Sequence, residues 1–152
     1  MLTAAAHVAV VLATLFALAG CVVFQYEGLI LIWRWLSRHQ GHRRVKVLYG
    51  IFSVIVLHVV EIWIFGAVLS LLLQWPACGS LSGAQSADFL QCIYLSAITF
   101  STVGFGDIVP VGPVRFLVGT EALSGFILIT WSASFTYLEM QRFWRSEEMK
   151  PD

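Results

Sequence analysis

One short segment of this sequence combines residue types that can coordinate a cation. Residues 99–110 read TFSTVGFGDIVP and lie between two long apolar segments. Gly104 and Gly106 can adopt positive φ at little steric cost. If backbone handedness alternates through residues 101–107, successive carbonyl oxygens point to the same side and form a row of partial negative charges. Such a row can replace the water shell of a desolvated cation.

The elements that position this segment must be membrane helices. The chain has 152 residues, of which 59% are hydrophobic and 12% are charged, and its mean hydropathy is +0.82. That leaves too little polar material to cover the surface of a soluble domain. The formal net charge is zero, so nothing global indicates a nucleic-acid partner. In a membrane protein, the non-helical backbone of residues 101–107 must be buried in protein or line water.

Three segments are long enough to cross a bilayer, which takes about 20 apolar residues in a helix. They cover residues 4–24, 48–73 and 114–138. Residues 87–100 form a further apolar segment that is too short to span and leads into the glycine motif. Residues 29–36, which contain Trp and Arg, are expected either to continue the first span or to lie along the inner interface. The predicted fold class is an all-α membrane protein with three transmembrane helices and a re-entrant helix followed by a loop.

The basic residues orient these spans. Only Arg115 falls outside two groups that lie between the first two spans and after the third. The groups are Arg34, Arg38, Arg43, Arg44 and Lys46, and Arg142, Arg145 and Lys150. The positive-inside rule then predicts that the 34–46 connection and the C-terminus are cytoplasmic, with the N-terminus and residues 76–112 outside. No basic residue precedes the first apolar run, so we expect no cleaved signal peptide.

Two pairs of polar residues lie three positions apart and therefore share a helix face. His58 and Glu61 lie in the second span. A carboxylate at the bilayer centre costs about 2.5–3.5 kcal/mol on insertion scales, so Glu61 should face protein, a cavity or a partner, or stay protonated. The pair predicts either a polar link between helices or a gating or pH-sensing element. Glu139 and Arg142 predict an ion pair at the inner interface.

The three cysteines do not form a disulfide framework. Cys21 lies inside the first span, where a small apolar residue is expected. Cys78 and Cys92 both fall in the outer region, and the sequence does not fix the distance between them. A disulfide between these two residues therefore remains open.

Residues 102–107, Thr-Val-Gly-Phe-Gly-Asp, resemble the selectivity filter of potassium channels. Phe105 stands where tyrosine is commoner in that family. The resemblance covers residues 50–142. It implies a pore module at 47–145, preceded by an N-terminal helix with a basic connection at 1–46 and followed by a short cytoplasmic tail at 146–152. Within the module it implies an outer helix at 48–75, an outer loop at 76–86, a pore helix at 87–100, a filter at 101–107 and an inner helix at 113–142.

The resemblance also implies how ions bind. Potassium ions would bind at the carbonyl oxygens of Thr102, Val103, Gly104 and Phe105, Gly106 would complete the filter, and Asp107 would stand at the outer mouth. One filter strand cannot surround an ion, so a single motif per chain implies a homotetramer on a four-fold axis.

The implied function is passive, potassium-selective conduction across the plasma (inner) membrane. It requires membrane lipid and permeant K⁺, with no further cofactor, no nucleic acid and no small-molecule substrate, and the protein is not expected to be an enzyme. Two alternatives stay open: a poorly selective cation channel, and a non-conducting regulatory subunit of a mixed channel.

This sequence departs from the family pattern behind the filter. Many relatives carry a tryptophan pair in the pore helix, and the corresponding positions here are Tyr94 and Leu95. Ile98 replaces an acidic residue of some relatives, and Phe105 has no hydroxyl group to donate. We therefore expect a differently braced filter. A regularly spaced arginine helix is absent from the sequence, so no voltage sensor of the usual kind is expected.

The inner helix carries further candidate residues. Gly125 and Gly119 are candidate hinges, although either could be a close-packing site against a neighbouring helix. Thr130 and Ser134 lie four apart and are candidates for lining a cavity, with ordinary helix packing as the alternative. Glu121 is expected in the outer half of this helix, behind the filter, either hydrogen-bonded or protonated.

Overall fold

The computed structural model describes residues 2–38, 43–83 and 88–148. Three of its helices are long and apolar enough to cross a membrane, which confirms the predicted all-α membrane fold with three spans. The elements in chain order are α1 (Leu2–Arg38), α2 (Arg43–Leu73), the short 3-10 helix η1 (Pro76–Cys78), β1 (Ser80–Ser82), α3 (Phe89–Phe100), β2 (Val109–Val111) and α4 (Arg115–Glu148).

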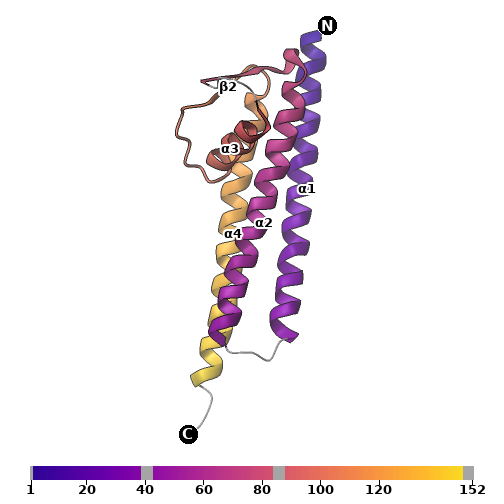
Figure 1. The fold of residues 1–152 in the computed structure, drawn as a ribbon. Coiled ribbons are helices and arrows are strands. Elements are labelled where there is room, and N and C mark those ends of the chain that lie inside the picture. The colour runs from indigo at the N-terminus through magenta and orange to yellow at the C-terminus, as the bar shows by residue number, and fades with distance from the viewer. Residues whose placement is uncertain (1, 39–42, 84–87, 149–152) are drawn as a thin grey trace.

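The three long helices run side by side (Figure 1). Helix α1 begins at the end of the bundle that holds α3 and β2. The C-terminal end of α1, the N-terminal end of α2 and the C-terminal end of α4 lie at the opposite end. Helix α2 packs against α1, α3 and α4, and α1 also packs against α4. The start of α1 and the pore loop therefore lie at one end of the bundle, and the end of α1, the start of α2 and the end of α4 lie at the other. Which end faces the cytoplasm stays a prediction.

Helix α1 is continuous over 37 residues, so residues 29–36 continue the first span and do not form a separate interfacial helix. At 1.5 Å per residue it is about 55 Å long, against about 30 Å for the hydrocarbon core. Gly28 lies within this helix at a close approach to α2. A Cβ on Gly28 would lie 2.5 Å from the Leu57 side chain of α2.

Helix boundaries differ from the predictions where the sequence lacks a clear stop. Helix α2 begins at Arg43, earlier than the predicted 48, and ends at Leu73. Helix α4 begins at Arg115 instead of 113, because the chain turns through Gly112 and Pro113. It ends at Glu148, inside the predicted tail 146–152, since neither glycine nor proline follows until Pro151. Residues 84–87, which comprise the end of the predicted outer loop and the predicted first residue of the pore helix at 87, lie outside the described residues.

The largest buried cluster lies beneath the outer loop and joins all four helices. Its members are Ala6, Val10, Leu69, Cys78, Cys92, Leu95, Ile98, Val114 and Leu117. Cys78 and Cys92 are both buried in it, yet neither is in a disulfide, and Cys21 is also free. Burial raises the pKa of both the Cys78 and the Cys92 thiol. The sequence did not decide whether Cys78 and Cys92 form a disulfide, and the structure contains two buried free thiols at these positions.

We expect all three thiols to be free and Cys78 and Cys92 to react slowly with a maleimide while the protein is folded. Each unit by which the pKa rises cuts the reactive thiolate about tenfold, and burial hinders access further. The measurement is labelling in detergent at neutral pH, before and after denaturation. A Ser82→Cys variant, exposed in β1, supplies a fast-reacting control. A mobility change on reduction of the monomer band would contradict the free-thiol state.

Candidate ion-conducting site

The glycine motif is anchored to the C-terminal end of α3. The Ser101 N–H donates to the Ala97 carbonyl oxygen at 3.1 Å, and the Thr102 N–H donates to that of Thr99 at 2.9 Å. The Gly104 N–H reaches back to the Ile98 carbonyl oxygen at 3.0 Å. These bonds satisfy carbonyl groups that a helix end leaves unpaired. They also hold the motif at the negative end of the α3 dipole, which favours a cation.

Backbone handedness alternates along the motif. Thr102, Gly104 and Gly106 have φ of 60°, 52° and 78°, whereas Val103 and Phe105 do not have positive φ. The alternation expected at the two glycines is therefore present, and it extends to Thr102. A β-branched residue rarely adopts positive φ, which costs on the order of 1–3 kcal/mol. Nothing in a single sequence signals this conformation at a threonine.

The motif is open on one side of the chain. Residues 101–107 are all exposed, and Val103 and Phe105 are 55% and 71% exposed. A Cβ at Gly104 or Gly106 would meet nothing within 4 Å, so these glycines are required by φ and not by packing within the chain. Large apolar side chains exposed together indicate a surface that another molecule covers.

A side-chain bond links the pore helix to the end of the motif. The Tyr94 hydroxyl of α3 donates to Asp107 Oδ2 at 2.8 Å, and this bond raises the pKa of Tyr94. Leu95, the second position of the family's tryptophan pair, is buried in the core instead. This arrangement fits the differently braced filter that we expected.

A two-stranded antiparallel sheet fixes the chain as it leaves the motif. Strands β1 and β2 pair antiparallel, with Leu81 opposite Pro110. At Gly83 a Cβ would lie 2.0 Å from the Asp107 carbonyl oxygen, so the outer loop touches the motif backbone. The sequence did not reveal this sheet, whose two strands are separated by α3 and the motif. Each strand has only three residues, and a proline argues against a strand except at an edge.

The two candidate hinge glycines differ in their surroundings. A Cβ on Gly125 would lie 2.2 Å from the Phe100 carbonyl oxygen, whereas one on Gly119 would meet nothing within 4 Å. Gly125 is therefore a close-packing site between α4 and the last residue of α3. Bending at either glycine stays a prediction.

Thr130 and Ser134 point away from the chain's own helices. Both are exposed, and their hydroxyls donate to the backbone carbonyl oxygens of Phe126 and Thr130. The buried face of α4 carries Ser124, Leu128 and Ser132 instead. This placement excludes packing within the chain, and the cavity-lining role stays a prediction.

His58 and Glu61 contact each other, with 2.8 Å between His58 Nδ1 and Glu61 Oε2. The His58 ring lies 5.7 Å from that of Phe100, so the pair on α2 also packs against the end of α3. No group of three potential metal ligands exists in the described part of the chain. Glu139 and Arg142 form the predicted ion pair at 3.1 Å.

Two buried polar links between helices were not predicted. Gln25 Nε2 of α1 donates to Ser132 Oγ of α4 at 2.5 Å. The Ser96 hydroxyl of α3 contacts the Ile62 carbonyl oxygen of α2 and a carboxylate oxygen of Glu121. Glu121 is thus hydrogen-bonded behind the motif, as expected. The sequence does show a polar residue inside each apolar span, but it does not show which residue of another helix that polar residue contacts.

Comparison with known proteins agrees with this geometry. The sequence model of a family described as "Ion channel" matches residues 45–140, more than half of the chain. The chain is 30% identical over 112 residues to the inward rectifier potassium channel Kirbac3.1 of Paramagnetospirillum magnetotacticum, covering 71% of this chain and 36% of that protein. It is 38% identical over 53 residues to Protein LctB of Geobacillus stearothermophilus, covering 35% of this chain and 40% of that protein.

The chain belongs to the ion-channel family, and its pore module is of the potassium-channel type. It spans well under half the length of these curated relatives. No solved structure matches it significantly. Helix α1, which ends at Arg38, lies wholly outside the family match, which begins at residue 45.

We expect Gly125→Ala to destabilise the chain and Gly119→Ala to be tolerated. The added methyl group at position 125 meets the Phe100 backbone, which cannot rotate away, and overpacking of this kind costs about 1–3 kcal/mol. The measurement is thermal unfolding of both variants in detergent. Equal stability of the two variants would contradict the close-packing role.

Replacement of Tyr94 by Phe removes the bond to Asp107 and should loosen the filter. We expect a several-fold lower preference for K⁺ over Na⁺ in a flux assay, with Tyr137→Phe as the control. Because the pKa of Tyr94 is raised, the bond is intact below about pH 10 and is lost as the pH rises through that raised pKa. Unchanged ion preference in Tyr94→Phe would show that this bond does not brace the filter.

Proposed function

We propose that this protein is a subunit of a homotetrameric channel that conducts K⁺ passively and selectively. The observation that carries the proposal is the alternating backbone at residues 102–106, held at the C-terminal end of a short helix. In the proposed pore, carbonyl oxygens replace the ion's water shell at Thr102, Val103, Gly104 and Phe105. Several ions occupy the filter, and repulsion between adjacent ions moves them along it.

The proposed tetramer is supported by the fact that one chain alone forms an incomplete ion site. A single strand of carbonyl groups covers one side of an ion, so a closed ring of four copies completes each site. The exposed Val103 and Phe105 side chains would then be covered by neighbouring subunits. The relative Kirbac3.1 is named as a potassium channel, which supports K⁺ as the permeant ion.

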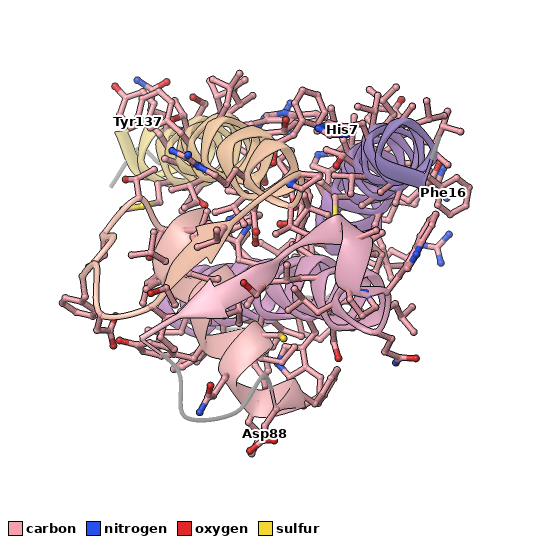
Figure 2. All side chains as sticks on the ribbon, turned by 90° about the horizontal axis from the view of Figure 1, so that it is seen from above. His7, Phe16, Asp88 and Tyr137 are labelled. Atoms are coloured by element: carbon pink, nitrogen blue, oxygen red, sulfur yellow. The ribbon has the colours of Figure 1, made fainter. Side chains whose placement is uncertain are left out.

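The faces of α4 and α1 fit this assembly. Thr130 and Ser134 face away from the chain's own core and would line the cavity below the filter. Helix α1 lies on the side of the bundle opposite the loop between α3 and β2 (Figure 1). Seen along the bundle, Phe16 of α1 points outward, and it is 83% exposed (Figure 2). We therefore place α1 at the lipid-facing periphery of the tetramer.

The membrane orientation follows from charge. With the basic connection and the C-terminus on the cytoplasmic side, the filter mouth at Asp107 faces outward. We assign the protein to the plasma membrane on this basis. Asp107 at the outer mouth would raise the local concentration of cations.

The test is ion flux from proteoliposomes that contain only this chain, under opposed K⁺ and Na⁺ gradients. Gly104→Asp should abolish flux, because aspartate disfavours the positive φ and adds a charge to the filter. Ser82→Asp, which adds the same charge to the exposed outer loop, should conduct as the unmodified protein does. Block by Ba²⁺ and tetramer mass in the same preparation complete the measurement.

Each outcome decides between the candidate functions. Selective flux that Gly104→Asp abolishes supports the proposal. Equal permeation of K⁺ and Na⁺ would identify a poorly selective cation channel, consistent with a filter that lacks the tyrosine hydroxyl. A tetramer that carries no flux under any pH or lipid composition would point to a regulatory subunit.

A further inference from the structure

The Ser96 hydroxyl sits at a junction of three helices. Its oxygen lies 2.8 Å from the Ile62 carbonyl oxygen of α2 and also contacts Glu121 Oε1 of α4. Ser96 and Glu121 are both 0% exposed. Ser96 lies one helical turn before Phe100, the residue at which α3 ends and the filter begins. The hydrogen bonds of Ser96 therefore help to position the end of α3, from which the filter begins.

The number of hydrogens available on Ser96 and Glu121 determines which group donates each hydrogen bond at the junction. A serine hydroxyl has one hydrogen and can donate one hydrogen bond, while its oxygen can also accept. The Ile62 carbonyl oxygen can only accept. If Glu121 were ionised it could also only accept, and one of the two contacts would lack a hydrogen. Both contacts are hydrogen bonds when Glu121 carries a proton and donates to Ser96 Oγ, which then donates to Ile62.

In the described part of the chain, no cationic group forms an ion pair with Glu121 that would neutralise a negative charge. Its Oε2 also has no hydrogen-bond partner there. The titratable groups on the elements packed around Glu121 include Cys21 of α1, His58 and Glu61 of α2, and Cys92 and Tyr94 of α3. His58 is already bonded to Glu61, and Cys21 lies within Coulombic range of both carboxyl groups. A buried carboxylate without a cation is much less stable than the neutral acid.

The contact between α3 and α4 leaves little room for adjustment. Ser96 meets Glu121, and one turn further along both helices Phe100 meets Gly125. At the second contact the backbones are so close that a Cβ would lie 2.2 Å from the Phe100 carbonyl oxygen. Glu121 is therefore separated from the Phe100–Gly125 contact by only one turn of each helix.

We propose that Glu121 is a protonated hydrogen-bond donor that positions the pore helix against the inner helix, and that its deprotonation at alkaline pH stops conduction. An ionised Glu121 leaves Ser96 one hydrogen for two acceptors, so the junction loses a bond and gains a buried charge. The conduction clause rests on the proposed channel function. The protonation of Glu121 does not, and it is tested separately.

Infrared spectroscopy tests the proton directly and needs no flux. In lipid at neutral pH, the spectrum should contain a protonated-carboxyl C=O band that Glu121→Gln removes and Glu61→Gln leaves in place. Ser96→Ala should shift this band, because the acid loses its acceptor. A wild-type pH titration, which requires no variant to fold, should remove the band at alkaline pH. Carboxylate bands in place of the protonated band in the wild-type minus Glu121→Gln difference would overturn the proposal.

Flux measured against pH tests the positioning role. Glu121→Gln keeps a donor to Ser96 and cannot ionise, so its flux should stay near the wild-type value at neutral pH and should not fall at alkaline pH. Glu121→Leu keeps a similar volume without a donor, and its flux should be roughly twofold to tenfold lower at neutral pH.

Tyr94 and the cysteines also titrate at alkaline pH, but Glu121→Gln retains all of them. An alkaline loss of flux that persists in Glu121→Gln would overturn the role of Glu121 in that loss. Absence of flux in every variant, with the infrared band present, would refute the channel function while leaving the protonated donor established.

Discussion

The structure depends on one constraint: backbone polar groups at membrane depth must find partners other than lipid. Between the end of α3 at Phe100 and the start of β2 at Val109, the chain forms neither helix nor strand. Its first N–H groups bond back to α3, and the remaining segment alternates in handedness at Thr102, Gly104 and Gly106. The carbonyl oxygens of this segment need a partner other than lipid, which can be water or a cation. A row of such oxygens suits a cation that has lost its water shell, and we therefore propose a cation there.

The rest of the chain keeps this irregular segment in one conformation. It is held at its base by the Phe100–Gly125 contact, at its outer end by the Tyr94–Asp107 bond, and from above by the approach of Gly83 to Asp107. A positive φ at Thr102 persists only where the surroundings determine it. The neighbours therefore maintain a backbone that the segment alone would not choose.

The sequence predicts local features of this fold and misses the contacts between distant residues. Apolar length gives the three spans, and glycine spacing gives the positive φ at Gly104 and Gly106, because both are patterns within one segment. The end of α4 was wrong because no residue stops the helix at 146–148. The sequence left open whether the first helix continues past Gly28, and the structure shows that it does. The bonds between Tyr94 and Asp107 and between Gln25 and Ser132 join residues 13 and 107 positions apart. No periodicity reports such pairs.

Helix α1 is more than a membrane anchor, although it lies wholly outside the family match. Its small residues Ala17 and Cys21 are buried beside Leu128 of α4, and Gln25, one turn further on, bonds to Ser132. Small residues allow close approach of membrane helices, and a polar bond between them contributes about 0.6 kcal/mol on average. Each link is weak, but together they fasten α1 to the inner half of the inner helix. Any bending of α4 below Gly125 must therefore either break the Gln25–Ser132 bond or carry α1 with it.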